Sequence, residues 1–411
     1  MRLRILLLSQ VLPYPLDSGP KIRIYYVLKQ LSQRHRVTLL SFVRSAEEVQ
    51  LLPHLLEFCE DVRTVLIKRS IVRDAFSLLL SFVYNRPFII LRDYVSDMQS
   101  AVETLVNAGS FDVVHADQLG MAQYAENLSG VKRILDEHNA VWTILERLYV
   151  QEGNRLKRAL LRRECENLKR YEARVCHRFD QVLAVTEADR KALQSVSSHD
   201  CNIEVIPICG DPSAIPVVER LTGTKKILHV GTMFWPPNVD GVLWFSREVY
   251  PMIKREVPDA EFYIVGARPP REVKRLQRTT LDIIVAGYVE ELLPYWKDSA
   301  VFVVPLRAGG GMRVKIIEAL SRGVPIVTTS VGCEGIEAQD GEHLLIADEP
   351  REFAEAVVEV MQDDDLAAHL ARSGRRLVEE KYDWRIVYGK LTEVYDRIGS
   401  SIVPRVAAPR E

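Results

Sequence analysis

A glycine-rich turn followed by two basic residues is the most distinctive chemical feature of this 411-residue chain. Gly309, Gly310 and Gly311 follow a short apolar run, and Arg313 and Lys315 stand where a helical pattern begins, near residue 312. Each cation at a helix N-terminus costs about 0.3–1 kcal/mol, because the free N–H groups there carry positive partial charge. A bound anion would reverse that cost, since N–H groups and cations would all point at it. The arrangement therefore predicts a diphosphate site.

An ordinary surface interpretation of the same residues stays open. Lys315 and Glu318 are three residues apart, so on a helix they would share a face and form an ion pair worth about 0.2–0.5 kcal/mol. That pair explains Lys315 but leaves Arg313 and the three glycines unexplained, so we favour the diphosphate site. Glu318 would then accept hydrogen bonds from sugar hydroxyls.

The elements that must position these residues are short apolar runs alternating with longer amphipathic stretches. This alternation predicts parallel sheets covered by helices on both faces. The expected strands are 3–8, 37–42, 62–67, 112–115, 131–135, 181–185 and 203–206, then 227–230, 261–265, 282–286, 301–304 and 325–328. Residues 142–179 form one long, charge-rich helical pattern with a break. The fold class is therefore α/β, with two doubly wound, Rossmann-like domains that face each other across a cleft.

The division of the chain follows from a pause in this alternation. The stretch CGDPSAIPVVERLTGTKK has two prolines, two glycines and no periodicity, which is typical of a linker. We predict an N-terminal acceptor domain over 1–210, a linker over 211–224 and a donor domain over 225–382. A final helix over 383–399 could pack back on the first domain, and the tail over 400–411 is expected to be disordered.

Composition excludes several classes of protein. The net charge of −2 argues against nucleic-acid binding, and six scattered cysteines without a C-x-x-C pair indicate neither a zinc site nor a disulfide framework. A cytoplasmic setting fits best, with the inner face of the membrane as a peripheral location. Two basic stretches, 68–88 and 154–179, leave two interpretations open. They could lie on an anionic membrane, or, as we prefer, they pack their apolar faces internally.

More of the chain points to a known family. PLRAGGGMRVKIIEALSRGVPIVTT resembles the donor-binding segment of retaining GT-B glycosyltransferases, in the group often called family 4. HVGTMFWPPNVDG, AEFYIVG, IIVAGYVEEL and VIPICGD resemble that family's neighbouring strands and linker, and LPYPLDSGPKIRIYYVLKQ resembles its N-terminal glycine loop. The chain looks most like bacterial sugar transferases associated with exopolysaccharides. The resemblance implies transfer of a sugar, with retention, from a nucleotide-diphosphate sugar to a hydroxyl of a glycan, lipid-linked or small-molecule acceptor.

The resemblance assigns roles residue by residue. Glu318 matches the second glutamate of the family's E-x7-E motif and would bind the ribose. The position of the first glutamate is occupied by Gly310, so the resemblance does not identify the donor sugar. The loop after residue 230 lacks the family's cations, so Arg313 and Lys315 are expected to supply that charge. No cofactor and no metal are implied. Donor contacts are expected at Gly19, Gly231, Thr232, Gly287, Tyr288, Val289, Gly309, Gly310, Gly311 and Met312. Core packing explains Tyr288 equally well, and Gly19 could be a simple turn glycine.

A histidine at a strand end completes the predicted site. His138 follows the strand 131–135, where family 4 enzymes typically have a histidine near the reacting sugar, so it is our candidate catalytic residue with Arg313 and Lys315. His115, with Asp117 beside it, is a weaker candidate on the acceptor side. Two alternatives to a transferase remain. A nucleotide-sugar epimerase would need an acid/base set that we do not find, and a non-catalytic nucleotide-sugar sensor or partner subunit is favoured only by the missing glutamate.

Overall fold

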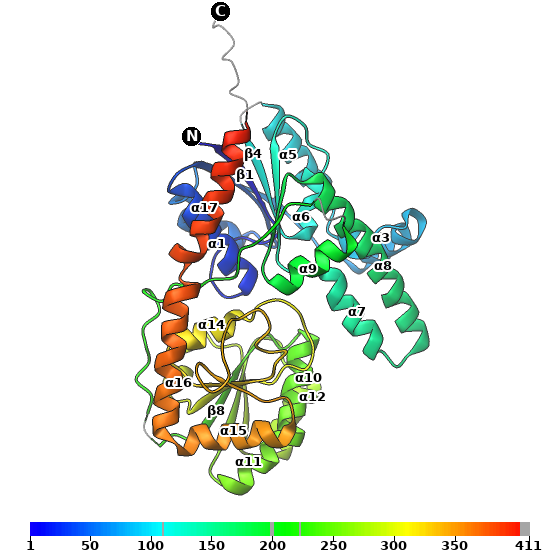
Figure 1. The fold of residues 1–411 in the computed structure, drawn as a ribbon. Coiled ribbons are helices and arrows are strands. Elements are labelled where there is room, and N and C mark those ends of the chain that lie inside the picture. The colour runs from blue at the N-terminus through cyan, green and yellow to red at the C-terminus, as the bar shows by residue number, and fades with distance from the viewer. Residues whose placement is uncertain (109–110, 198–200, 222, 403–411) are drawn as a thin grey trace, which may run out of the picture. The chain divides into compact units, whose positions relative to one another are not determined.

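Two compact α/β units make up the structure, a computed structural model that describes residues 1–108, 111–197, 201–221 and 223–402 (Figure 1). The first unit contains residues 1–207 and the chain from Val387 onward, and the second contains residues 208–386. Each unit is built on one parallel sheet flanked by helices. The predicted α/β class with two doubly wound sheets is therefore confirmed.

The first sheet has the strand order β3-β2-β1-β4-β5-β6-β7. Its strands are β1 (Arg4–Ser9), β2 (Arg36–Val43), β3 (Asp61–Leu66), β4 (Val113–Asp117), β5 (Lys132–Glu137), β6 (Gln181–Ala184) and β7 (Ile203–Val205). Residues 5–8 are all 0% exposed, because helices cover both faces of the sheet and an apolar run without alternation is what such a strand requires. All seven strands predicted for this half of the chain are confirmed.

Different helices cover the two faces of this sheet. They are α1 (Gly19–Ser32), α2 (Pro53–Leu56), α3 (Ile71–Tyr84), α4 (Phe88–Arg92), α5 (Ser96–Asn107), α6 (Leu119–Ala125), α7 (Val141–Gln151), α8 (Arg155–Arg178), α9 (Glu187–Val196) and α17 (Trp384–Ser401), with a 3₁₀ turn at Glu47–Leu51. α1 and α17 share one face, where Gln30 donates to Thr392 (2.8 Å). α5, α6, α8 and α9 pack their apolar residues on the other face around one hydrophobic core.

The long helical pattern over 142–179 is two helices, α7 and α8, as its predicted break indicated. Asn154 lies between them and caps α8, because its side chain accepts a hydrogen bond from the N–H of Lys157 (3.0 Å). From Cys165 onward α8 packs internally, with Cys165, Leu168 and Val175 fully buried.

The preferred interpretation of residues 68–88 was wrong. It held that the apolar face of this segment packs internally, but the only buried residues of α3 are Ser77 and Ser81. The apolar residues Ile71, Phe76 and Val83 are 88%, 59% and 66% exposed. The hydrophobic pattern identified the helix correctly, but it could not say which face meets the protein.

The second sheet has the order β10-β9-β8-β11-β12-β13. Its strands are β8 (Lys226–Val230), β9 (Glu261–Val265), β10 (Ile283–Gly287), β11 (Val301–Val304), β12 (Ile326–Thr328) and β13 (Leu345–Ile346). Its helices are α10 (Pro236–Trp244), α11 (Tyr250–Glu256), α12 (Arg271–Thr279), α13 (Leu293–Lys297), α14 (Val314–Ser321), α15 (Pro350–Gln362) and α16 (Asp364–Leu377), with π-helical turns at Phe245–Val249 and Val378–Tyr382. The five predicted strands are confirmed, and the two-residue β13 has too little pattern to be predicted.

The segments at the predicted domain boundaries are attached to one unit or the other. The predicted linker over 211–224 belongs to the second unit, where Val218 donates to the carbonyl of Arg322 (2.9 Å) and Leu221 to that of Lys297 (3.2 Å). α17 continues to Ser401, two residues into the predicted tail, and residues 403–411 lie outside the described part of the chain. Within the described residues, no helix combines the length and apolar character needed to cross a membrane.

Candidate active site

The strand orders identify one place in each sheet where a ligand can bind. In the first sheet the chain reverses direction of winding between β1 and β4, and in the second sheet between β8 and β11. Open parallel sheets bind ligands outside the carboxyl ends of the strands at such switch points, because the loops there diverge to opposite faces. Most of the predicted site residues follow β1, β5, β8, β10 or β11 and therefore lie at these two edges.

Polar residues at the end of the first sheet are aligned by strand register. Ser9 of β1 is opposite Asp117 of β4, and Asp117 is opposite Asp136 of β5. All three are 0% exposed. The Ser9 hydroxyl donates to Asp117 (3.2 Å), as does the side-chain amide of Gln118 (3.4 Å). The sheet thus carries two buried carboxyl groups side by side at its switch point.

Asp136 is held by a buried ion pair. Arg23 of α1 donates to both of its carboxylate oxygens, at 2.7 and 2.9 Å, and to the carbonyl of Ile206 (2.7 Å). Burial by itself would raise the pKa of Asp136, but the charge of Arg23 and the hydrogen bonds to the carboxylate together outweigh it and hold the pKa well below its usual range. His115 lies beside the pair, with Nε2 3.9 Å from Asp136 and Nδ1 2.7 Å from the hydroxyl of Tyr395. His115 is therefore a buried structural residue in this network.

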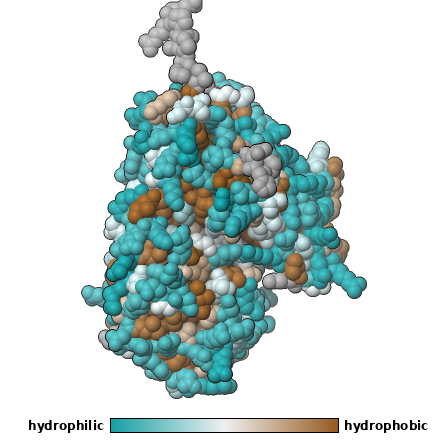
Figure 2. Space-filling model, viewed as in Figure 1, coloured by the Kyte–Doolittle hydropathy of each residue, from teal (hydrophilic) through white to brown (hydrophobic). Residues whose placement is uncertain are grey.

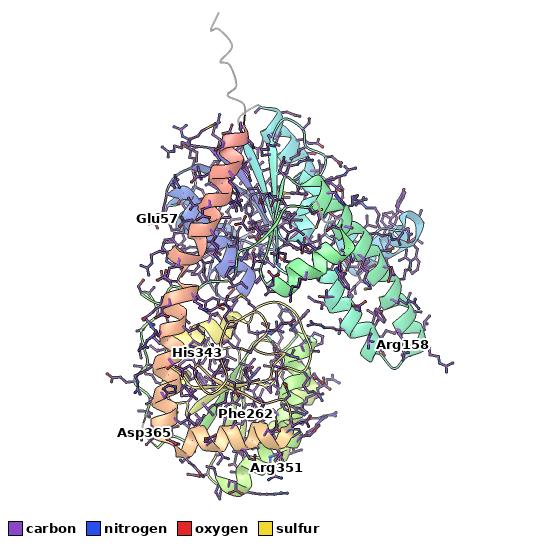
Figure 3. The ribbon with its side chains drawn as sticks, in the orientation of Figure 1. Glu57, Arg158, Phe262, His343, Arg351 and Asp365 are labelled. Atoms are coloured by element: carbon purple, nitrogen blue, oxygen red, sulfur yellow. The ribbon has the colours of Figure 1, made fainter. Side chains whose placement is uncertain are left out.

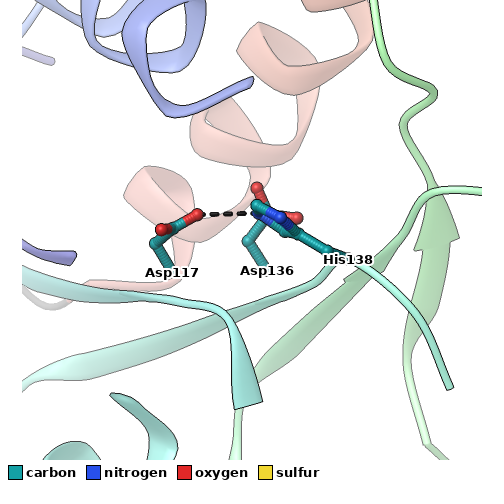
Figure 4. Close-up of side chains that lie close together, drawn as sticks. All are labelled: Asp117, Asp136 and His138. Atoms are coloured by element: carbon teal, nitrogen blue, oxygen red, sulfur yellow. Dashed lines mark hydrogen bonds and ion pairs between the residues drawn. The ribbon is translucent and has the colours of Figure 1, made fainter. Parts of the chain in front are cut away.

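His138 follows β5 and contacts the other carboxyl group. Its Nε2 lies 2.8 Å from Oδ1 of Asp117, and its side chain is 10% exposed (Figure 4). Because a carboxylate only accepts hydrogen bonds, Nε2 carries the proton and donates to Asp117, so Nδ1 is the ring nitrogen left for a ligand. Ligand atoms of Asp117, Asp136 and His138 lie within 4.8 Å of one another, a spacing that could hold a metal ion. Both oxygens of Asp136 are already bound by Arg23, which fits such an ion poorly.

A second group of acids lies on the opposite face of β5, because adjacent strand residues point to opposite faces. Glu137 is fully buried against Glu172 of α8 and near Asp189 of α9. Burial and then the charge of Glu172 raise the pKa of Glu137 far above its ordinary value, and burial also raises the pKa of Glu172. Glu172 accepts hydrogen bonds from the N–H groups of Val141 (2.6 Å) and Trp142 (3.2 Å). These acids therefore fix the start of α7, three residues after His138.

In the second unit, the loops after β8 and β9 touch through glycines. Gly231 donates to the carbonyl of Val265 (3.0 Å), and a Cβ on Gly266, which has φ +159°, would lie 1.7 Å from the carbonyl oxygen of Gly231. A Cβ on Gly231 would lie 3.0 Å from Nε2 of the buried His229, whose pKa is lowered by burial to about 4. His229 is therefore neutral, and only glycines allow these two loops to approach.

The glycine loop after β11 adopts a conformation that favours glycine. Gly309 has φ +137° and Gly311 has φ +72°. The side chain of Arg313 donates to the carbonyls of Gly310 and Gly311 (3.0 Å to the latter). Arg313 is the N-cap residue of α14, so the helix begins at Val314, two residues later than the pattern predicted. Arg313 therefore stabilises the conformation of the glycine loop from the N-terminus of α14.

Lys315 forms the ion pair that the surface interpretation described. Its Nζ lies 2.7 Å from Glu318, and Arg322 lies 3.2 Å from the other oxygen of Glu318. Burial would raise the pKa of Glu318, but the charges and hydrogen bonds of Lys315 and Arg322 lower it below its ordinary value. Glu318 is therefore an ionised acceptor one turn into α14.

Aromatic side chains stand exposed around the same edge. Tyr288, after β10, is 73% exposed, so the core-packing interpretation of this residue was wrong. Phe234 and Trp235, after β8, are 61% and 43% exposed. Arg268, after β9, has φ +58° and its guanidinium lies 5.6 Å from the ring of Phe234. Sequence reasoning missed Arg268, although a cation in the loop three residues after the end of β9 was the signal that could have found it.

The remaining predicted residues take simpler places. Gly19 is the first residue of α1, after β1 and therefore at the same edge as His138. Gly287 has φ +73° at the end of β10, Val289 is half-buried, and Thr232 is exposed. Met312 is 6% exposed and its sulfur accepts a hydrogen bond from Ile208 (3.3 Å), so only its backbone remains for a ligand.

Comparison with known proteins agrees with this geometry. Residues 224–363 match the family described as glycosyl transferases group 1. The chain is a glycosyltransferase. A Klebsiella pneumoniae protein described as an uncharacterized 44.6 kDa protein in the cps region is 24% identical over 404 residues, which cover 94% of this chain and 98% of that protein. The phosphatidyl-myo-inositol mannosyltransferase of Mycobacterium leprae is 26% identical over 43% of this chain and 48% of its own length.

Solved structures show the same GT-B architecture. Sucrose-phosphate synthase from Thermosynechococcus elongatus superimposes with a TM-score of 0.73 at 15% identity, covering 98% of this chain and 100% of that chain. Anabaena HepE in complex with UDP and glucose gives a TM-score of 0.69 at 14% identity, covering 96% and 100%. At these identities the likeness shows the fold alone.

Proposed function

We propose that this protein is a retaining glycosyltransferase of the family 4 type, which transfers a sugar from a nucleoside diphosphate sugar to a hydroxyl of a glycan or lipid-linked acceptor. The observation that carries the proposal is the glycine loop at the β8/β11 switch point, which leads into α14 with Arg313 at its N-cap and Glu318 one turn later. The positive charge at the start of α14 suits a diphosphate, and the ionised Glu318 suits the hydroxyls of a ribose.

The donor diphosphate is bound by the start of α14. The first N–H groups of the helix have no partner within the helix and can donate to phosphate oxygens. Lys315 has three N–H donors, of which the ion pair with Glu318 uses one, so the same ammonium group can also bind a phosphate. Glu318, held ionised by Lys315 and Arg322, accepts from the ribose hydroxyls. The exposed Tyr288 offers a ring for the base.

The chemical step depends on the charge that grows on the departing diphosphate. Arg313, Lys315 and the N–H groups of the glycine loop stabilise that charge by fixed electrostatic interactions, which commonly supply the largest part of such a rate enhancement. His138, oriented by Asp117, is our candidate catalytic residue in the first unit, where its Nδ1 can accept a hydrogen bond from a sugar hydroxyl. Asp117 and Asp136 are occupied by His138 and Arg23, so we assign no carboxylate nucleophile and propose attack from the face that the diphosphate leaves.

The biological class of product is a bacterial polysaccharide or glycolipid. Support comes from the relative in the Klebsiella cps region and from the Staphylococcus aureus capsular polysaccharide biosynthesis glycosyltransferase CapM, which is 26% identical over 28% of this chain and 30% of its own length. Structures of Anabaena HepE contain UDP and UDP-glucose, which supports a nucleotide-bound donor of this general kind.

The test begins with thermal stabilisation by UDP-, GDP-, ADP- and dTDP-sugars. One of them is expected to raise the melting temperature, and acceptor extracts should then accelerate its consumption. A second candidate, a non-catalytic nucleotide-sugar sensor, is favoured by one observation, the glycine at position 310 where the family's first glutamate belongs. Stabilisation by a donor without consumption in any bacterial polysaccharide or lipid extract would favour the sensor, and no stabilisation by any donor would refute both.

A further inference from the structure

Helix α3 is oriented with its polar side inward and its apolar side outward. Its two buried residues are serines. Its outer face consists of apolar side chains that are all at least 46% exposed: Ile71 (88%), Val72 (80%), Phe76 (59%), Leu78 (46%), Leu79 (59%), Phe82 (47%), Val83 (66%) and Tyr84 (64%). Brown residues at the edge of the first unit in Figure 2 lie where Figure 1 labels α3. An apolar patch of this kind marks an interaction site, because it costs solubility without stabilising the core.

Specific contacts hold α3 in this orientation. Arg163 of α8 donates to the hydroxyl (3.2 Å) and to the carbonyl (2.6 Å) of Ser81, and its guanidinium lies 4.1 Å from the ring of Phe82. The hydroxyl of Ser81 donates to the carbonyl of Arg86 (2.7 Å). Ser70 caps the helix by accepting from the N–H of Arg73 (3.2 Å). These hydrogen bonds fix the polar side against the protein, so the outer face must meet something else.

Cations are concentrated in the segment that carries α3 and in the start of α8. Residues 68–86 contain four cations against one acid, and residues 154–163 at the start of α8 contain five cations and no acid, although the whole chain has a net charge of −2. Residues 155–160 of α8 are all exposed, including Leu156 (72%) and Leu160 (47%). Figure 3 shows Arg158 extending away from the α7–α8 hairpin. An apolar stripe bordered by Lys and Arg is typical of a helix that lies in a membrane interface.

We propose that the outer face of α3 inserts into the interface of an anionic lipid bilayer, while Arg155, Lys157, Arg158 and Arg162 of α8 bind the lipid head groups. A second copy of the chain is a poorer occupant, because a symmetric contact would bring two strongly basic surfaces together. The inference goes beyond the proposed sugar transfer. It concerns where the enzyme attaches, and it holds whichever donor is used.

The test is co-sedimentation of the full-length protein with phosphatidylcholine vesicles, with and without about one-third phosphatidylglycerol. We expect pelleting with the anionic vesicles, little with the neutral ones, and weakening by salt. The double variant Phe76→Ser/Leu79→Ser should bind anionic vesicles at least about tenfold more weakly, since two exposed apolar side chains are lost from the contact. Arg155→Gln/Arg158→Gln should also weaken binding by about tenfold or more, at roughly fivefold for each cation.

Matched controls keep the outcome decisive. Leu281→Ser, at a site 92% exposed in the second unit, should leave vesicle binding unchanged. Because the substituted side chains are exposed, all variants should retain the melting temperature of the parent within a few degrees. Equal vesicle binding by the parent and Phe76→Ser/Leu79→Ser would overturn the proposal. A parent protein that does not bind anionic vesicles would overturn it as well. If the parent forms a dimer in sedimentation velocity and Phe76→Ser/Leu79→Ser abolishes that dimer, the face would instead be assigned to self-association.

Discussion

Replacing Glu137 by Gln should make the first unit more stable at neutral pH. Glu137 is fully buried next to Glu172, and burial together with that neighbouring carboxyl group raises its pKa far above 4.5, the ordinary value. The folded unit therefore keeps a proton on this side chain at pH values where the unfolded chain has released it. A Gln side chain has nearly the same shape and cannot ionise, so it removes this linkage.

The sign and size follow from proton counting. Between pH 4.5 and the raised folded pKa, the folded state binds more protons than the unfolded state, so the free energy of unfolding falls as pH rises. The slope is about 1.4 kcal/mol per pH unit for each retained proton. As the pH rises above 4.5, the parent should therefore lose stability at this slope for as long as the folded state keeps the proton, while Glu137→Gln should not.

The assay must report on the first unit by itself. Denaturant unfolding of the full chain can be followed by dithiodipyridine labelling and peptide mass spectrometry, because all six cysteines are buried free thiols. Cys165 and Cys176 lie in the first unit, and Cys209 and Cys333 lie in the second and serve as an internal control. Glu166→Gln, on the same helix as Glu172 but with a side chain 54% exposed, is the matched variant that should change little. Parallel pH dependences for the parent and Glu137→Gln would refute the reasoning.

Three further predictions concern the site. Asp117→Asn should lower kcat at least about tenfold while changing donor affinity less than about threefold. The substitution misorients His138 but does not alter the diphosphate site. Equal losses in kcat and donor affinity would contradict this. Gly266→Ala should destabilise the second unit by more than about 2 kcal/mol in the same labelling assay, because its Cβ would lie 1.7 Å from the carbonyl oxygen of Gly231. A variant as stable as the parent would show that the loop relaxes freely. EDTA should leave turnover unchanged, and a loss that Mg²⁺ or Mn²⁺ restores would assign a metal to Asp117, Asp136 and His138.

The sequence predicted the strands well because their signal is local. Each buried parallel strand is an unbroken apolar run, so its position could be read without knowing its neighbours. His138 could be placed at a strand end for the same reason. Its partner Asp117 could not be assigned, because that contact depends on the pairing of β4 with β5 and on their register, which local sequence does not encode.

The errors have physical causes as well. The amphipathic pattern of α3 defined an apolar face, but only the hydrogen bonds of Ser81 with Arg163 show that this face points outward. The chemistry of Lys315 was predicted both ways, as an anion ligand and as a partner of Glu318. The structure contains the ion pair, while the anion remains a proposal.

The affinity of a nucleoside diphosphate for Lys315→Met, measured by calorimetry, tests the central claim most directly. The diphosphate to use is the one whose sugar conjugate stabilises the parent, and the matching nucleoside without phosphates is the control ligand. We predict that Lys315→Met weakens diphosphate binding by about 10- to 150-fold, the value of a charge-assisted hydrogen bond, and leaves nucleoside binding unchanged. Diphosphate binding as tight as in the parent would contradict the assignment of the start of α14 as the diphosphate site.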